Sequence, residues 1–288
     1  MKRYSGKNAV MAVAVMAGLS VGFCEAQAAT VNDWYAYYSA DRGDRVEDGG
    51  TGSPTYYLAN LNTARSINTV WSYFDSVSLV DGGSITLSTS ISIDFKSAAS
   101  APFDTFRFGL FQSGATRATT STFGSDRYVS TLPTPDPTVD WKGFFLSATS
   151  TGAENYIYRR TSGSYSSTNV TTMSTAMSDA VANPTFMDNT PIALTLTYSR
   201  VGNDLVVSGF LGEDSFAGTY VGAFSNGYSN VFDTLGFYSS NTSGNLQLAS
   251  VSFLNTTITA IPEPSVTMLL ILAGGVGLFC VGSRVRAA

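Results

Sequence analysis

Apolar and polar residues alternate in several short runs of this chain, and this period of two constrains the fold more strongly than any other feature. From Ile85 to Phe95 the apolar residues occupy odd positions, with mainly Ser and Thr between them. Phe106, Phe108 and Leu110 repeat the pattern. Successive side chains of a β-strand point to opposite faces, so each run predicts a strand with one buried face.

A second pair of alternating runs predicts a β-hairpin. Apolar residues alternate over 192–198 and again over 205–211, and the turn-forming residues Gly202, Asn203 and Asp204 lie between the two runs. Further strands are predicted at 142–148, 155–159, 216–224, 234–239 and 246–254.

Two details qualify this strand pattern. In the last predicted strand the apolar parity switches between Leu248 and Val251, which predicts a bulge near residues 249–250. Residues 173–181 are predicted to form a short helix or a turn. No stretch of the domain shows a sustained apolar stripe at helical spacing.

Many short strands separated by Gly, Ser and Asn predict an all-β fold, an antiparallel β-sandwich or jelly roll, over residues 29–260. Segments 112–140 and 160–190 are rich in Ser and Thr and are predicted to be loops, where a binding function would lie. Both cysteines, Cys24 and Cys280, lie outside this domain. Disulfides therefore cannot stabilise it, and packing must do so.

Residues 1–28 have the composition of a secretion signal. Basic residues near the start precede an apolar run over 9–23, and Ala26 and Ala28 form a small-residue cleavage site. This order predicts a helical signal peptide that is cleaved after Ala28. The alternative is a buried N-terminal helix.

Residues 261–288 form a second segment of distinct composition. Pro262, Glu263 and Pro264 precede an apolar run over 266–282, and Arg284 and Arg286 follow it. About 17 apolar residues is the lower limit for a helix that spans a membrane, and the arginines favour a cytoplasmic end. A single C-terminal transmembrane helix is predicted, with a buried core helix as the alternative.

This tail resembles the PEP-CTERM sorting signal of Gram-negative bacteria that make exopolysaccharide, although it ends in only two arginines. The resemblance covers 261–288 and implies recognition by an exosortase, a membrane protease that is thought to cut the tail and transfer the protein to another anchor. The expected route begins with the general secretion machinery. It continues through an intermediate held in the inner membrane by the C-terminal helix and ends at the cell surface or outside the cell.

Several domain segments resemble the concanavalin-like and laminin-G-like sandwiches found on many PEP-CTERM proteins. They are FRFGLF at 106–111, DWKGFF at 140–145, the hairpin at 194–209, and LGFYSS followed by the last predicted strand. The resemblance implies the same sandwich fold and identifies no ligand.

The charge of the domain argues against nucleic acid as a partner. Of the 21 acidic residues in the chain, 19 lie between 29 and 261, and of the 16 basic residues, 11 do, which gives a formal net charge of −8. Nucleic-acid binding depends on cationic contacts to phosphate.

The residues needed for most catalysis are missing from the sequence. The chain contains no histidine, which excludes Ser-His and Cys-His nucleophiles and histidine-based metal sites. Laminarinase-like glycosidases on this kind of sandwich use carboxylates two positions apart, and no such pair occurs here. Two carboxylates from different strands could still form a catalytic pair, so a glycosidase is retained as the least favoured hypothesis. No catalytic residue is assigned.

One acidic cluster could bind calcium through oxygen ligands in a glycine-bearing segment. Neighbouring arginines could instead pair with these acids and leave a solvated loop. The residues are Asp41, Asp44, Glu47 and Asp48, beside Arg42 and Arg45.

Four aromatic residues are candidates for stacking against sugar rings, because sugars pack their C–H groups on apolar ring faces. They are Trp34, Tyr37, Tyr56 and Trp71. Ordinary packing in the sandwich core is the alternative.

Together these features predict a non-catalytic, exosortase-sorted protein of the cell surface or extracellular matrix, associated with exopolysaccharide or biofilm. The alternative function is a lectin-like carbohydrate-binding module, with calcium as the one candidate cofactor and polysaccharide as the candidate partner.

Overall fold

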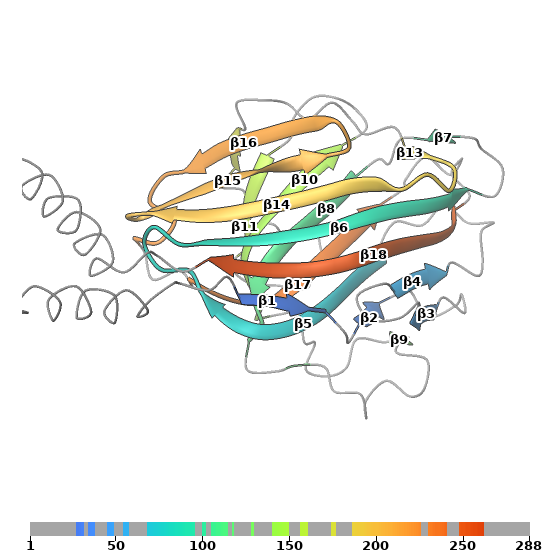
Figure 1. Cartoon of the computed structure of the whole chain (residues 1–288), viewed down its shortest axis with the longest axis horizontal. Coiled ribbons are helices and arrows are strands. Elements are labelled where there is room, and N and C mark those ends of the chain that lie inside the picture. Colours follow the sequence, from blue (N-terminus) through green and yellow to red (C-terminus); the bar gives the residue numbers. More distant parts are fainter. Residues whose placement is uncertain are drawn as a thin grey trace, which may run out of the picture.

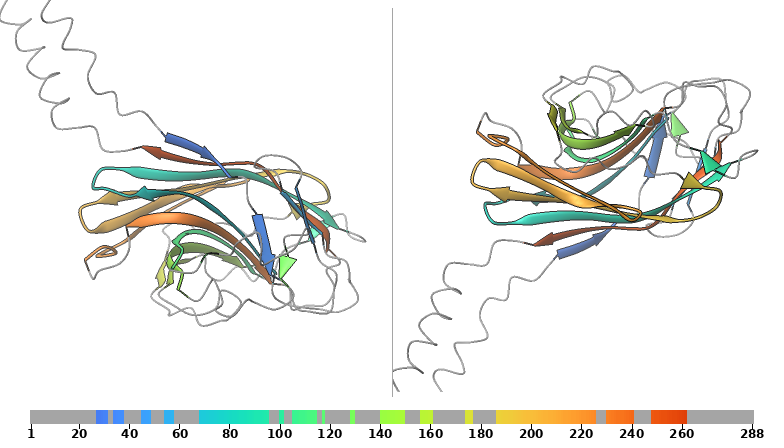
Figure 2. Two further views of the ribbon diagram at one scale, coloured as in Figure 1. Left: turned by 90° about the horizontal axis from the view of Figure 1, so that it is seen from below. Right: turned by 90° about the horizontal axis from the view of Figure 1, so that it is seen from above.

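The computed structural model of the chain describes residues 27–31, 34–37, 45–48, 54–57, 68–95, 100–101, 105–114, 117, 128–129, 140–149, 156–160, 174–176, 186–225, 230–240 and 248–261. These residues form two β-sheets that pack face to face as a sandwich, seen edge-on in Figure 2. The predicted all-β, antiparallel β-sandwich is confirmed. Among the described residues, no helix has the length and apolar character of a membrane span.

The first sheet runs in the order β16-β15-β14-β6-β18-β4-β3, with β1 also paired to β18 (Figure 1). All of its pairings are antiparallel. Its strands are β1 (Gln27–Thr30), β3 (Arg45–Asp48), β4 (Pro54–Tyr57), β6 (Ser84–Phe95), β14 (Ile192–Val201), β15 (Asp204–Leu211), β16 (Asp214–Tyr220) and β18 (Leu248–Ile261).

The second sheet runs in the order β12-β11-β10-β8-β17-β5-β2-β9, and only the short β2–β9 pair in it is parallel. A separate two-stranded ribbon joins β7 (Ser100–Ala101) to β13 (Phe186–Met187). The strands of the second sheet are β2 (Trp34–Tyr37), β5 (Asn68–Ser78), β8 (Thr105–Gln112), β9 (Tyr128–Val129), β10 (Lys142–Thr149), β11 (Tyr156–Arg160), β12 (Ser174–Ala176) and β17 (Val231–Ser240).

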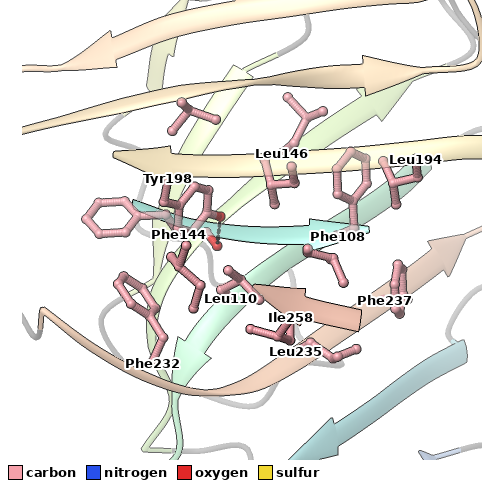
Figure 3. Packing of buried hydrophobic residues seen from close by; sticks show 14 of the residues in the cluster. Phe108, Leu110, Phe144, Leu146, Leu194, Tyr198, Phe232, Leu235, Phe237 and Ile258 are labelled. Carbon is pink, nitrogen blue, oxygen red and sulfur yellow. Dashed lines mark hydrogen bonds between the residues drawn. The ribbon is translucent and has the colours of Figure 1, made fainter. Parts of the chain in front are cut away.

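The core lies between the two sheets and follows from the alternation in the sequence. Phe108 and Leu110 in β8 are fully buried, and so are four of the apolar residues predicted for the inner face of β6, which are Ile85, Leu87, Ile91 and Ile93. Figure 3 shows Phe108 and Leu110 among the rings and aliphatic side chains that pack between the layers. The Tyr198 hydroxyl donates across the core to the Phe144 carbonyl oxygen at 2.6 Å.

The predicted hairpin is confirmed as β14 and β15. Val201 pairs with Asp204, so Gly202 and Asn203 form the turn. Gly202 has a φ of 62°, a conformation that glycine adopts without strain. Its backbone N–H donates to Asp81 Oδ1 at 2.6 Å, which ties this turn to the start of β6.

The predicted bulge in β18 is also confirmed, since the register against β6 shifts between Leu248 and Ser250. A second shift lies between Leu254 and Thr257 and was not predicted. There Asn255 has a φ of 55°, and Thr256 turns into the interior, where its hydroxyl lies 2.9 Å from that of Thr89.

Some predicted elements need correction. The strand predicted over 216–224 ends at Tyr220, because residues 221–225 form a turn in which the Gly222 N–H donates to Asp204 Oδ1 at 2.7 Å. The helix or turn predicted over 173–181 is wrong for residues 174–176, which pair with β11 as a strand. The predicted loops at 112–140 and 160–190 also contain the short strands β9, β12 and β13.

The two ends of the described domain lie side by side, because Gln27 pairs with Ala260 across β1 and β18. Ala28 is exposed and lies opposite Thr259. Most of the predicted signal peptide, Ala26 included, and the predicted transmembrane segment at 266–282 lie outside the described residues.

Candidate functional site

The outer face of the second sheet carries its own cluster of aromatic rings, in addition to those of the core. Most outer faces of sandwich sheets are polar, because only the inner face packs on the partner sheet. We call this cluster the aromatic face. Its rings belong to Tyr35, Trp71, Phe111, Trp141, Phe145 and Tyr238, which are buried, and to Tyr73 and Tyr158, which are half-buried.

Strand register explains how these rings come together. Trp71, Gly236, Gly109 and Phe145 lie in one row across β5, β17, β8 and β10. The two central glycines leave the middle of the row without side chains. A Cβ atom at Gly109 would clash with the backbone of Phe144 and Phe145, so the tight approach of β8 and β10 requires glycine there.

The rings form a continuous chain of contacts across the sheet. Distances between ring centroids describe this chain. Tyr35 stacks on Trp71 at 5.7 Å, Trp71 contacts Trp141 edge to face at 5.9 Å, and Trp141 stacks on Phe111 at 5.4 Å. The chain ends in Tyr73, 5.5 Å from Tyr35, and in Tyr158, 5.3 Å from Phe145, which itself lies 6.4 Å from Phe111. The two half-buried tyrosines are therefore the points at which a ligand could reach the chain of rings.

Two arginines lie on these rings. The Arg107 guanidinium carbon is 5.1 Å from the centre of the Tyr238 ring and 5.8 Å from that of Phe145, and its Nε donates to Ser147 Oγ at 3.3 Å. The Arg117 guanidinium carbon lies 5.1 Å from the centre of the Tyr73 ring. Both cations are within the range of a cation–π interaction.

A buried carboxylate fixes Arg117 beside Tyr73. Asp233 lies where the register of β17 shifts against β5, and its Oδ2 accepts from Arg117 Nη2 at 2.6 Å and from Ser113 Oγ at 2.8 Å. Its Oδ1 accepts from the Ser113 backbone N–H at 2.6 Å and from Thr234 Oγ1 at 2.9 Å. Four donors occupy this carboxylate, and through them it holds Arg117 in place.

The Trp71 indole adds a donor that has no partner among the described residues. Its Nε1–H is fully buried on the aromatic face. A buried donor that is left unsatisfied costs about 1–3 kcal/mol.

Two of the four aromatic residues proposed from the sequence are buried and offer no exposed ring face. Trp34 lies on the inner face, with its ring stacked 5.5 Å from that of Phe253, and is part of the core. Trp71 belongs to the aromatic face but is also fully buried. The alternative of ordinary packing is therefore correct for Trp34, and exposed stacking is wrong for both tryptophans.

The other two aromatic candidates are placed only by their backbones. Tyr37 pairs with Thr69 at the end of β2, and Tyr56 pairs with Val251 from β4. Stacking by Tyr37 or Tyr56 stays a prediction.

The calcium prediction also remains open. Asp41 and Asp44 lie outside the described residues, whereas Glu47 and Asp48 end β3, opposite Thr55 and Pro54. Within the part of the chain that the structure describes, no three potential metal ligands come together. The sorting residues Pro262, Glu263, Pro264, Arg284 and Arg286 lie outside the described residues as well.

The sequence analysis missed Arg107, Arg117, Ser113 and Asp233. Their meeting depends on the register of β5, β8 and β17, since Ser113 and Asp233 are far apart in the chain. The aromatic face itself could have been predicted from pairs of adjacent large apolar residues in the strands. In each pair one side chain points to the core and the other to the outer face of the second sheet. The pairs are Trp34-Tyr35, Val70-Trp71, Leu110-Phe111, Phe144-Phe145 and Phe237-Tyr238.

No protein-family model matches this chain, and no curated protein matches it. Similar solved structures include the winged bean acidic lectin complexed with methyl-α-D-galactose, with 11% identity over 82% of this chain and 99% of that chain and a TM-score of 0.46. The carbohydrate recognition domain of Emp47p has 12% identity over 81% and 89%, with a TM-score of 0.44. Lectin II from Ulex europaeus has 11% identity over 83% and 99%, with a TM-score of 0.43. At these values the likeness does not extend to a ligand.

Proposed function

We propose that this protein is a non-catalytic carbohydrate-binding protein whose sandwich, of the concanavalin-like type, holds polysaccharide at the aromatic face. One observation carries the proposal. A continuous chain of aromatic rings with two arginines lies on the outer face of the second sheet and is separate from the core between the sheets.

The side chains at this face match the chemistry of sugars. Apolar ring faces at Tyr73 and Tyr158 accept the C–H groups of a pyranose ring, and the Arg117 and Arg107 guanidinium groups can donate to its oxygens. The side chain of Arg117 is 43% exposed, so this donor is within reach of a ligand.

The same geometry favours binding over hydrolysis. A glycosidase needs one carboxyl group that holds a proton and a second that acts as base or nucleophile. Asp233, the carboxylate that holds Arg117 at this face, already accepts four hydrogen bonds.

Binding can be tested with the purified full-length chain on an array of neutral and anionic polysaccharides. Tyr158→Ala and Tyr73→Ala each remove a half-buried ring worth about 0.5–1.5 kcal/mol, so about 2- to 10-fold weaker binding is expected. Val201→Ala, at the exposed hairpin turn away from this face, is the control and should bind normally. Equal binding by all variants would contradict the proposal.

Tryptophan fluorescence gives a second measurement. Two of the three tryptophans, Trp71 and Trp141, lie on the aromatic face, and the third, Trp34, lies in the core. A ligand at this face should change the emission of Trp71→Phe less than that of the wild type, because one reporter is removed.

We also propose that the protein is exported and sorted by an exosortase, on the basis of its terminal sequences. Strand β18 ends at Ile261, so a cut in the segment from Pro262 to Pro264 would leave the sandwich intact. Replacing Pro262, Glu263 and Pro264 by alanine should therefore change the cellular fate and apparent mass of the protein without changing its polysaccharide binding. An unchanged cellular fate and mass would contradict the sorting proposal and leave the polysaccharide-binding proposal unaffected.

A further inference from the structure

The outer face of the first sheet has a character opposite to that of the aromatic face. Three rows of outward side chains cross β16, β15, β14, β6 and β18, and most of them are Ser or Thr; the exceptions are Val206, Phe210, Ala217 and Ile261. None carries a formal charge. We call this surface the hydroxyl face; it consists of alternate residues within 84–88, 195–199, 206–210, 215–219 and 257–261.

The hydroxyl groups are regularly spaced. Neighbouring strands lie about 4.8 Å apart, and alternate residues along a strand lie about 6.7 Å apart. One row runs Ser208, Thr197, Thr86, Thr259 across four strands, and the hydroxyls of Thr86 and Thr197 are 2.9 Å apart. Because these residues are half-buried rather than buried, their remaining donors and acceptors face outward.

One aromatic ring stands out from this face. Phe210 is 54% exposed and is the only aromatic residue among the exposed large apolar residues that the structure describes. It lies between Thr195 on β14 and Ser215 on β16, with Ser208 two residues before it on the same strand. An apolar ring flanked by hydroxyl groups is the combination that contacts a sugar ring on its face and at its edges.

Charge and area favour one kind of occupant. The domain has a net charge of −8, yet this face has no charge, so an anionic polymer would be repelled and would find no cation here. The three rows cover roughly 400 Å², whereas each partner in a stable protein dimer buries about 800 Å². A second copy of the chain would therefore be held weakly, but an extended neutral polysaccharide needs only a strip of this surface.

We propose that the hydroxyl face is a second polysaccharide-binding surface, which takes neutral polysaccharide with Phe210 stacked on a pyranose ring. Thr195, Ser208 and Ser215 exchange hydrogen bonds with the hydroxyls of that ring. This surface is independent of the aromatic face, because the two lie on opposite outer sides of the sandwich (Figure 2).

Native gel electrophoresis of the full-length chain through gels cast with a polysaccharide tests this directly. Dextran and hydroxyethyl cellulose are the neutral probes, and carboxymethyl cellulose is the anionic one. Phe210→Ala should weaken retardation in a neutral gel about 2- to 10-fold in apparent affinity. Thr197→Glu, which places a carboxylate in the middle of the face, should weaken it as well.

The controls separate this surface from the aromatic face. Tyr158→Ala leaves the hydroxyl face intact, so Phe210→Ala should reduce retardation further in that background, and an effect of Tyr158→Ala alone reports on the aromatic face. Met187→Ala, at an exposed position on the separate β7–β13 ribbon, should migrate as the wild type does, and thermal unfolding should show that every variant is folded.

Three outcomes would overturn the inference. The first is a wild type that neither neutral gel retards, and the second is unchanged retardation of both Phe210→Ala and Thr197→Glu. The third is a dimer, seen by sedimentation, that Thr197→Glu dissociates, since a second copy would then occupy the face.

Discussion

Tyr198 and Tyr220 each bury a hydroxyl group in the core, and the two hydroxyls differ in their hydrogen bonding. Both rings contact Phe144, with centroids 6.2 and 5.8 Å away. The Tyr198 hydroxyl donates across the core to the Phe144 carbonyl oxygen (Figure 3). The Tyr220 hydroxyl is buried without a hydrogen-bond partner among the described residues. Burial of a hydroxyl is therefore compensated at one position and uncompensated at the other.

Removing each hydroxyl should change the free energy of unfolding in opposite ways. Tyr198→Phe loses a buried hydrogen bond and should lower that free energy by about 1–2 kcal/mol. Tyr220→Phe removes a polar atom that has no partner and should be neutral or stabilising. Urea unfolding of both variants checks this, and an equal loss in both would contradict the assignment of the hydrogen bond to Tyr198.

The candidate site was only partly predictable at the level of single residues. Trp71 could be picked out because aromatic residues cluster near it, but the sequence does not show that its ring is covered. Asp233 and Arg117 could not be picked out, because a carboxylate acquires its partners only when β8 and β17 pair in one register.

Strands with one apolar face were predicted from their alternation, whereas strands with two apolar faces give a weaker signal, and β5 was missed. In β6 and β14 one face packs in the core and the other carries mainly Ser and Thr, so the sequence alternates. In β5, Val70 faces the core while the adjacent Trp71 faces the aromatic face, and this removes the alternation. The short strands β7, β9, β12 and β13 have two or three residues each, too few for a period to appear.

The pairing of β8 with β10 depends on a glycine, and this gives a prediction at the level of the strands. Gly109→Ala places a Cβ against the backbone of β10 and should lower the free energy of unfolding by about 1–3 kcal/mol. Because Gly109 also lies in the row of the aromatic face that joins Trp71 to Phe145, polysaccharide binding should weaken too.

Gly202→Asn is the matched control for this change. Gly202 has open space around it and a positive φ, which asparagine tolerates, so stability and binding should stay close to those of the wild type. Thermal unfolding of both variants gives the comparison. If Gly109→Ala were as stable as Gly202→Asn, the inferred clash between a Cβ at residue 109 and the backbone of β10 would be wrong.

In the whole molecule, the two sheets turn different chemistry outward while they share one core. The outer side of the second sheet carries buried and half-buried aromatic rings with two arginines, and that of the first carries uncharged hydroxyls around Phe210. The adjacent ends of the domain, at Gln27 and Ile261, lie on β1 and β18 of the first sheet. A molecule with two separate binding faces can hold two polysaccharide chains at once, which a molecule with one face cannot do.

The two proposed faces together predict that the full-length chain crosslinks a neutral polysaccharide. The viscosity of a hydroxyethyl cellulose solution should rise as protein is added, and it should fall again at excess protein, because each face then holds a different polymer and few molecules bridge two. Tyr158→Ala and Phe210→Ala should each still bind polymer through the remaining face but thicken the solution much less. Full thickening by both variants would mean that one face, or a dimer, is sufficient for crosslinking, and the two-faced arrangement would then not explain it.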